Sequence, residues 1–135
     1  MGDERLRQLS PPLADLAAAH DRRQTQLAAC RLAVAAAGLD DGHAAAALQA
    51  LSSGGPDRQF AALSQELADQ YDEAAWTAQE SGSDTEYESF FRRARAASAL
   101  ACAHRDEASE AIYEAAHALT DTDGFDLALR AALSE

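Results

Sequence analysis

The chain has 135 residues, which is enough for one domain with a hydrophobic core and too few for two ordinary domains. Its 11 basic side chains are all Arg, and 23 acidic residues leave a net charge of −12. This charge argues against free nucleic acid and anionic membrane surfaces as ligands, because both are bound through Lys and Arg.

Alanine and leucine dominate the apolar residues. The chain contains 35 Ala and 16 Leu, but Val34 and Ile112 are its only aliphatic β-branched residues. Ala and Leu favour helices, whereas strands are built from β-branched and aromatic residues, so the composition predicts an all-α protein. Cys30 and Cys102 are expected to be reduced thiols, because no disulfide framework is apparent. With no signal peptide or membrane span in the sequence, we expect a cytoplasmic protein. The absence of Lys and Asn, with a single Ile, suggests a GC-rich coding sequence and therefore a bacterial origin.

The first helix is predicted over residues 11–37. Ser10 and the two prolines after it are typical of an N-cap and the first helical turn, and Gly38 is typical of a helix end. Apolar positions recur every three or four residues between these limits. The expected core stripe of this helix consists of Leu13, Leu16, His20, Arg23, Leu27, Cys30, Val34 and Ala37.

Asp40 or Asp41 is expected to cap a shorter helix over 42–52. Residues 52–56, with the sequence Ser-Ser-Gly-Gly-Pro, form the strongest break in the chain and predict a loop. A third helix is predicted over 57–80. Its expected core stripe consists of Phe60, Leu63, Leu67, Tyr71, Ala74 and Ala78.

The C-terminal part is predicted to be helical as well. Ser83 and Glu86 match a capping box, and no Gly or Pro occurs between residues 84 and 119. We expect a break near Asp106, which can act as an N-cap, because charged residues interrupt the apolar pattern there. A last short helix is predicted over 125–133.

These elements predict a single all-α domain over residues 1–135. We expect a bundle of five or six helices, preceded by an arm or short helix over 1–10. An alternative is a short array of three α-hairpins, because Gly38, Gly82 and Gly124 are separated by 44 and 42 residues.

Acidic residues are concentrated in the C-terminal half. Residues 56–135 hold 17 acidic and six basic side chains, a net charge of −11, and residues 64–90 hold eight acidic side chains and no basic one. Such a surface either keeps the protein soluble or binds a basic partner protein.

Trp76 is the candidate anchor of such an interaction. It lies off the expected core stripe of the third helix, and its helical neighbours are acidic. The indole is expected either to cover the terminal or the short second helix, or to anchor a dimer or partner interface. The candidate contact residues are Trp76, Asp69, Asp72, Glu73 and Glu80.

Two further clusters suggest ligand-binding sites. Arg92, Arg93 and Arg95 follow aromatic residues and could recognise phosphate or carboxylate groups, or form internal ion pairs with Glu88 and the acidic surface. The segment 114–117 matches the Glu-x-x-His element of di-iron bundles, which require further Glu ligands.

The leading functional hypothesis is a non-catalytic cytoplasmic protein that binds a basic protein or a second copy of itself. No catalytic, cofactor-binding or metal-ligating motif is complete in the sequence. One alternative is a metal-binding or enzymatic bundle that uses Glu114 and His117 with Glu66 or Asp69. Another is an acidic inhibitor, for instance an immunity-type protein that occupies a basic site.

Overall fold

The computed structural model describes residues 2–39, 42–119 and 121–134, and within them the chain is all-α with no strand. The described residues form eight helices, so the prediction of five or six is wrong in number. The helices are α1 (Gly2–Leu9), α2 (Pro11–Ala19), α3 (Arg22–Ala37), α4 (Gly42–Ser53), α5 (Arg58–Glu80), α6 (Asp84–His104), α7 (Ala108–His117) and α8 (Thr122–Leu133).

The additional helices lie in the N-terminal part. The expected arm is helix α1, and the expected helix over 11–37 is divided into α2 and α3 at His20. Asp21 is the N-cap of α3, and its side chain accepts a hydrogen bond from the Gln24 amide at 3.0 Å. The break changes which side chains face the core: His20 and Arg23 are exposed, whereas Thr25 and Gln26 are buried.

Most of the other predicted helix ends are confirmed. The Ser10 hydroxyl accepts a hydrogen bond from the Leu13 amide, and Gly38 ends α3 with a positive φ of 68°. Ser83 is the N-cap of α6, but its side chain makes no cap hydrogen bond, so the expected capping box does not form. The predicted caps Asp40 and Asp41 lie outside the described residues.

The break between α6 and α7 is confirmed, but its chemistry differs from the prediction. Asp106 lies in the turn with a φ of 62°, and Glu107 is the N-cap of α7. The glycine spacing does not mark equivalent positions either, because Gly124 lies inside the first turn of α8. Of the three hairpins in that alternative, only the one formed by α5 and α6 packs extensively along its length.

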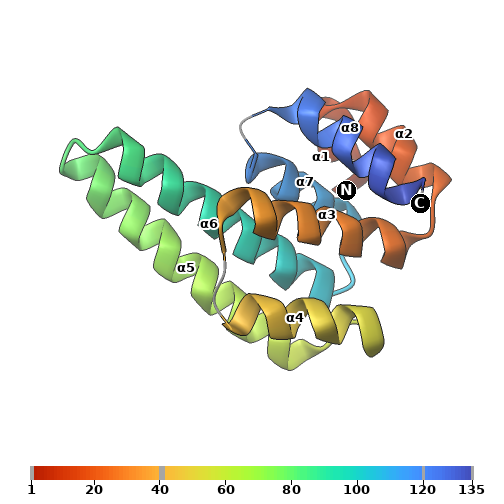
Figure 1. The fold of residues 1–135 in the computed structure, drawn as a ribbon, viewed down its shortest axis with the longest axis horizontal. Coiled ribbons are helices and arrows are strands. Elements are labelled where there is room, and N and C mark those ends of the chain that lie inside the picture. Colours follow the sequence, from red (N-terminus) through yellow and green to blue (C-terminus); the bar gives the residue numbers. More distant parts are fainter. Residues whose placement is uncertain (1, 40–41, 120, 135) are drawn as a thin grey trace.

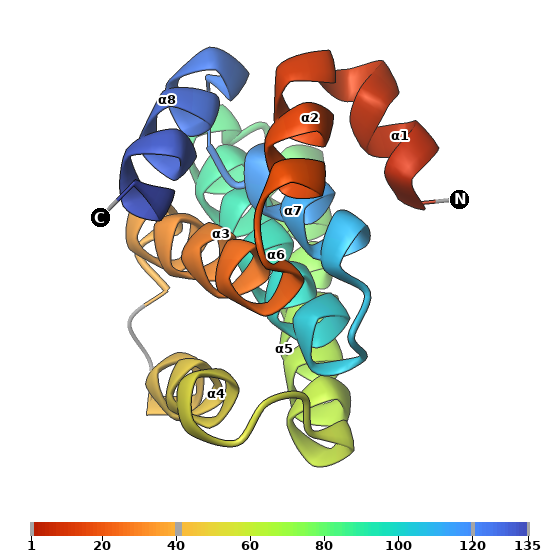
Figure 2. The ribbon, with the colours of Figure 1, turned by 90° about the vertical axis from the view of Figure 1, so that its right-hand side faces the viewer.

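Helix α6 is the centre of the fold. It packs against α5, α7, α3 and α4, while α1, α2 and α8 cover α3 and α7 on the side away from α5. Figure 1 shows the α5–α6 hairpin extending beyond the other helices at one end, and Figure 2 shows α5 on the outside of the bundle. Ala96 to His104 are all buried, as expected of a helix that is surrounded by others.

Helices α5 and α6 approach each other through small side chains. The buried residues of α5 are Ala61, Ser64, Ala68, Ala75 and Ala78. Of the predicted core stripe, Ala78 is buried, and Phe60, Leu67 and Tyr71 are half-buried and pack against the core. Ala74 is half-buried as well, and the prediction is wrong for Leu63, which is exposed. Small residues let the two helix axes come close, and the larger side chains are displaced to the flank of the contact.

One cluster of buried apolar residues draws on all eight helices. Its largest fully buried side chains are Phe125, Leu6, Leu13, Leu39, Leu100, Ile112 and Leu129. None of the described helices is long and apolar enough to cross a bilayer.

His104 joins three helices at the base of the hairpin. Its Nδ1 accepts a hydrogen bond from the Asp57 amide at 3.0 Å, and its Nε2 donates to the Ala47 carbonyl at 2.9 Å. The Phe60 ring stacks on the imidazole with a centroid separation of 5.3 Å. Both ring nitrogens are thus used by the neutral imidazole, in which one nitrogen accepts and the other donates.

We expect stability to fall at mildly acidic pH because of His104. Burial lowers the pKa of this buried imidazole, although the hydrogen bond to Ala47 partly opposes the shift. The unfolded chain therefore binds a proton first as the pH falls, so the contribution of His104 is complete above the unfolded pKa of about 6.5 and is lost below it. Urea unfolding at pH 7.5 and 5.5 tests this.

The variant His104→Gln is the reference for that measurement, because Gln can hydrogen-bond but does not titrate in this range. The unfolding free energy of the wild type should fall more between the two pH values than that of the variant. Equal pH dependence in the two proteins would show that His104 does not titrate on unfolding.

Candidate interaction surface on helix α5

The outer face of α5 carries a row of acidic side chains around the single Trp. Glu66, Asp69, Glu73, Trp76 and Glu80 are separated by alternating steps of three and four residues, which places them on one face of the helix. All five side chains are exposed. We call these five residues the acidic row. Helix α5 packs mainly against α6 on its opposite side and meets α4 only near its N-terminal end, so the row stays uncovered.

Trp76 is 65% exposed, which is unusual for the largest apolar side chain in the protein. The interpretation that its indole covers the terminal helix or the short second helix is therefore wrong. On the helix surface, Asp69, Glu73 and Glu80 lie one or two turns from the indole. The indole thus projects from a strongly negative surface.

Asp72, the fifth candidate contact residue, lies on the edge of this surface. Its Oδ2 is 2.6 Å from Nη2 of Arg95 on α6, and its side chain is half-exposed. Nη1 of Arg95 lies 3.1 Å from Oε2 of Glu114 on α7, and the Ser98 hydroxyl donates to Oε1 of the same carboxylate at 3.2 Å. Asp72 is therefore held by an ion-pair network that joins α5, α6 and α7.

This network determines the direction in which the pKa of the Arg95 guanidinium shifts. Burial alone would lower the pKa of the guanidinium, but the charges of Glu114 and Asp72 outweigh it and raise the pKa. The sequence predicted internal ion pairs for this arginine cluster. Arg95 forms them across the hairpin and with α7, and not with Glu88 on its own helix.

An open hollow of about 500 Å³ adjoins the acidic row at the base of the hairpin. Glu66 and Asp69 line it together with Arg58 and Arg105, and the Arg105 guanidinium donates to the Gln65 side chain at 2.7 Å. The charge along α5 therefore changes from mixed at the base to purely acidic around Trp76.

Glu114 and His117, the residues proposed above as metal ligands, form hydrogen bonds with other parts of the protein. Both oxygens of Glu114 receive hydrogen bonds from Arg95, and the His117 ring donates from Nδ1 to the Tyr113 carbonyl at 2.9 Å. Within residues 2–39, 42–119 and 121–134, no group of three or more His, Cys, Asp or Glu side chains is placed to hold a metal ion.

The two cysteines are unsuited to nucleophilic chemistry. Cys30 and Cys102 are free and buried. Burial raises the pKa of Cys30 strongly and that of Cys102 to about 11, so both stay protonated at neutral pH.

A second hollow was not predicted from the sequence. It lies between α1, α2, α3 and α7, has a volume of about 340 Å³, and depends on the break between α2 and α3 at His20. Arg7 and Arg22 line it, and no local pattern in the sequence relates them because the fold alone brings them to one cavity.

Comparison with known proteins gives no relative for this chain: no family model, curated protein or solved structure matches it.

Proposed function

We propose that this is a non-catalytic cytoplasmic protein that binds a basic surface of a partner protein through the acidic row of α5. The observation that carries the proposal is the 65% exposure of Trp76 within that row, between Glu73 and Glu80. An exposed indole presents a large apolar surface to water, and burying that surface against a partner is favourable. Trp is also enriched among the residues that dominate binding free energy.

The surrounding charges favour a partner rich in Arg or Lys. Glu66, Asp69, Glu73 and Glu80 would speed its approach and select its orientation, and an Arg side chain could stack on the indole. An acidic inhibitor that occupies the basic site of an enzyme is one form of this function. Two copies of the row would repel each other, so a homodimer through this face is the less favoured arrangement.

The experiment compares the proteins that bind to the immobilised wild type with those that bind to two variants, Trp76→Ala and the double variant Asp69→Asn/Glu73→Gln. We expect a basic protein that the wild type retains at low salt and that both variants lose, with an affinity reduced at least tenfold for Trp76→Ala. Because Trp76 is the only Trp, its fluorescence emission should shift to shorter wavelength when the purified partner is added.

Leu127→Ala is the matched control, since Leu127 is also exposed and apolar but lies on α8. This variant should bind as the wild type does. If every captured protein binds Trp76→Ala and the double variant as tightly as the wild type, the proposal is wrong. Light scattering after size-exclusion chromatography shows whether the protein is a dimer. If the wild type is a dimer that Trp76→Ala dissociates, the acidic row binds a second copy of the chain and not a basic partner.

A further inference from the structure

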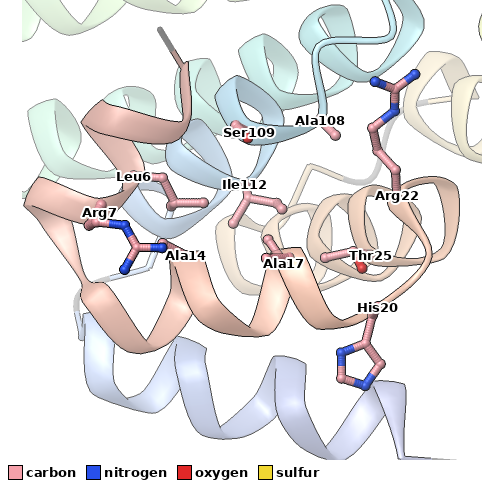
Figure 3. Close-up of a pocket in the computed structure, with 11 residues that line it drawn as sticks. Leu6, Arg7, Ala14, Ala17, His20, Arg22, Thr25, Ala108, Ser109 and Ile112 are labelled. Carbon is pink, nitrogen blue, oxygen red and sulfur yellow. The ribbon is translucent and has the colours of Figure 1, made fainter.

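The hollow between α1, α2, α3 and α7 differs chemically from the rest of this acidic protein. Figure 3 shows that it opens between the first two helices on one side and the N-terminal ends of α3 and α7 on the other. Its charged or titratable lining residues are Arg7, Arg22 and His20, and no acidic residue lines it in the part of the chain that the structure describes. The absence of a carboxylate from this lining distinguishes the hollow from the mixed one at the base of α5, and Asp15 and Asp106 pair with Arg7 and Arg22 from outside the lining.

The floor of the hollow is apolar. Leu6, Ala14 and Ile112 lie buried beneath it, and Ala17 and Ala18 supply its accessible apolar surface. The Thr25 hydroxyl is already used, because it donates to the Asp21 carbonyl at 2.8 Å. A ligand on this floor would therefore be held by apolar contact, and the volume of about 340 Å³ is that of a small-molecule pocket.

Positive charge lies at the two ends of the hollow. In Figure 3 the Arg7 and Arg22 side chains lie on opposite sides of the Leu6 and Ile112 floor, whereas the His20 ring points away from it. Ala108, at the N-terminal end of α7, lies on the same side as Arg22.

The arginines keep donors for a ligand. Arg7 pairs with Asp15 at 3.1 Å and Arg22 with Asp106 at 2.7 Å, each through one guanidinium nitrogen, and both pairs are largely exposed. A guanidinium has five N–H donors, and exposed ion pairs contribute little free energy. A carboxylate ligand can therefore share or replace these partners.

We propose that this hollow binds a small amphiphilic anion of the medium-chain carboxylate class. The alkyl chain lies against Ala17 and Ala18, above the buried Leu6 and Ile112, and the carboxylate lies at the Arg22 end. This site is separate from the acidic row of α5, and either proposal can fail without the other.

Octanoate is the probe, with octanol and octylammonium as ligands of matched chain length. In a two-dimensional NMR titration of the ¹⁵N-labelled protein, octanoate should give saturable shifts confined to amides of α1, α2 and the first turns of α3 and α7. Octanol should bind at least threefold more weakly than octanoate, and octylammonium more weakly still. Shifts spread over the surface, or equal binding of octanol or octylammonium, would overturn the proposal.

Variants locate the site. Arg22→Gln should weaken octanoate binding by roughly three- to tenfold, since one charge-assisted contact is lost. Arg31→Gln removes the same charge from an exposed position on α3 outside the hollow and should have no effect. Ala17→Phe fills the floor and should abolish binding, with helicity checked by circular dichroism. Binding to Arg22→Gln as tight as to Arg31→Gln would contradict the proposal even if Ala17→Phe failed to fold.

Discussion

Replacing Phe125 with Ala is expected to lower the free energy of unfolding by about 3–5 kcal/mol. Phe125 is the largest of the fully buried side chains, and it anchors α8 on the shared core. The substitution removes the favourable free energy of transferring the aromatic ring from water to the core. It also leaves a cavity that the surrounding helices cannot fill completely. Urea unfolding followed by circular dichroism measures the change.

Leu127→Ala provides the comparison on the same helix. Leu127 is 67% exposed, so its truncation should change the unfolding free energy by less than about 0.5 kcal/mol. Similar costs for the two substitutions would mean that α8 does not pack as described, because burial alone distinguishes the two positions.

Replacing Arg95 with Met is expected to destabilise the protein by about 2 kcal/mol. The methionine keeps part of the apolar stem, but Glu114 loses both hydrogen bonds from the guanidinium and Asp72 loses its 2.6 Å contact. The Glu114 side chain is only 17% exposed, so a carboxylate without its counter-charge is costly there.

A double-mutant cycle with Glu114→Gln separates this ion pair from other effects of the substitution. The loss of unfolding free energy in the double variant should be about 1 kcal/mol smaller than the sum of the losses in the two single variants. Arg92→Met, three residues earlier on α6, tests the loss of an arginine outside the network and should cost less. Strict additivity of the two single changes would show that Arg95 and Glu114 do not interact in solution.

The helix ends were largely predictable because they depend on local chemistry. Ser10 and Gly38 act through groups within a few residues of themselves, and the sequence displays them directly. The break at His20 was missed because it contains neither Gly nor Pro. The signal that could have found it is Asp21 followed by Gln24, which has the spacing of a capping box.

The rotation of α5 could not be predicted from its own sequence. Leu63, Leu67 and Tyr71 form the more apolar stripe, but the helix buries the face of Ala61 and Ala68 instead. That choice depends on α6, whose alanines permit a close approach that larger side chains would prevent. Periodicity identifies candidate faces, but the partner helix decides which face is buried.

The same limit applies to the candidate site. The acidic character of residues 64–90 was evident from composition, but the exposure of Trp76 depends on which helices cover α5. The pairing of Asp72 with Arg95 follows from the register of the hairpin, and the participation of Glu114 follows from the position of α7. Neither is encoded by local spacing.

The extended α5–α6 hairpin has a consequence for local motion. At its outer end the two helices rest mainly on each other, through Ala75 and Ala78, whereas the base is fixed by His104. Amides near Gly82 should therefore exchange with solvent deuterium by fraying, while those near His104 exchange only through global unfolding. A partner seated on Trp76 would suppress this fraying, so protection factors at the tip would report occupancy far from the core.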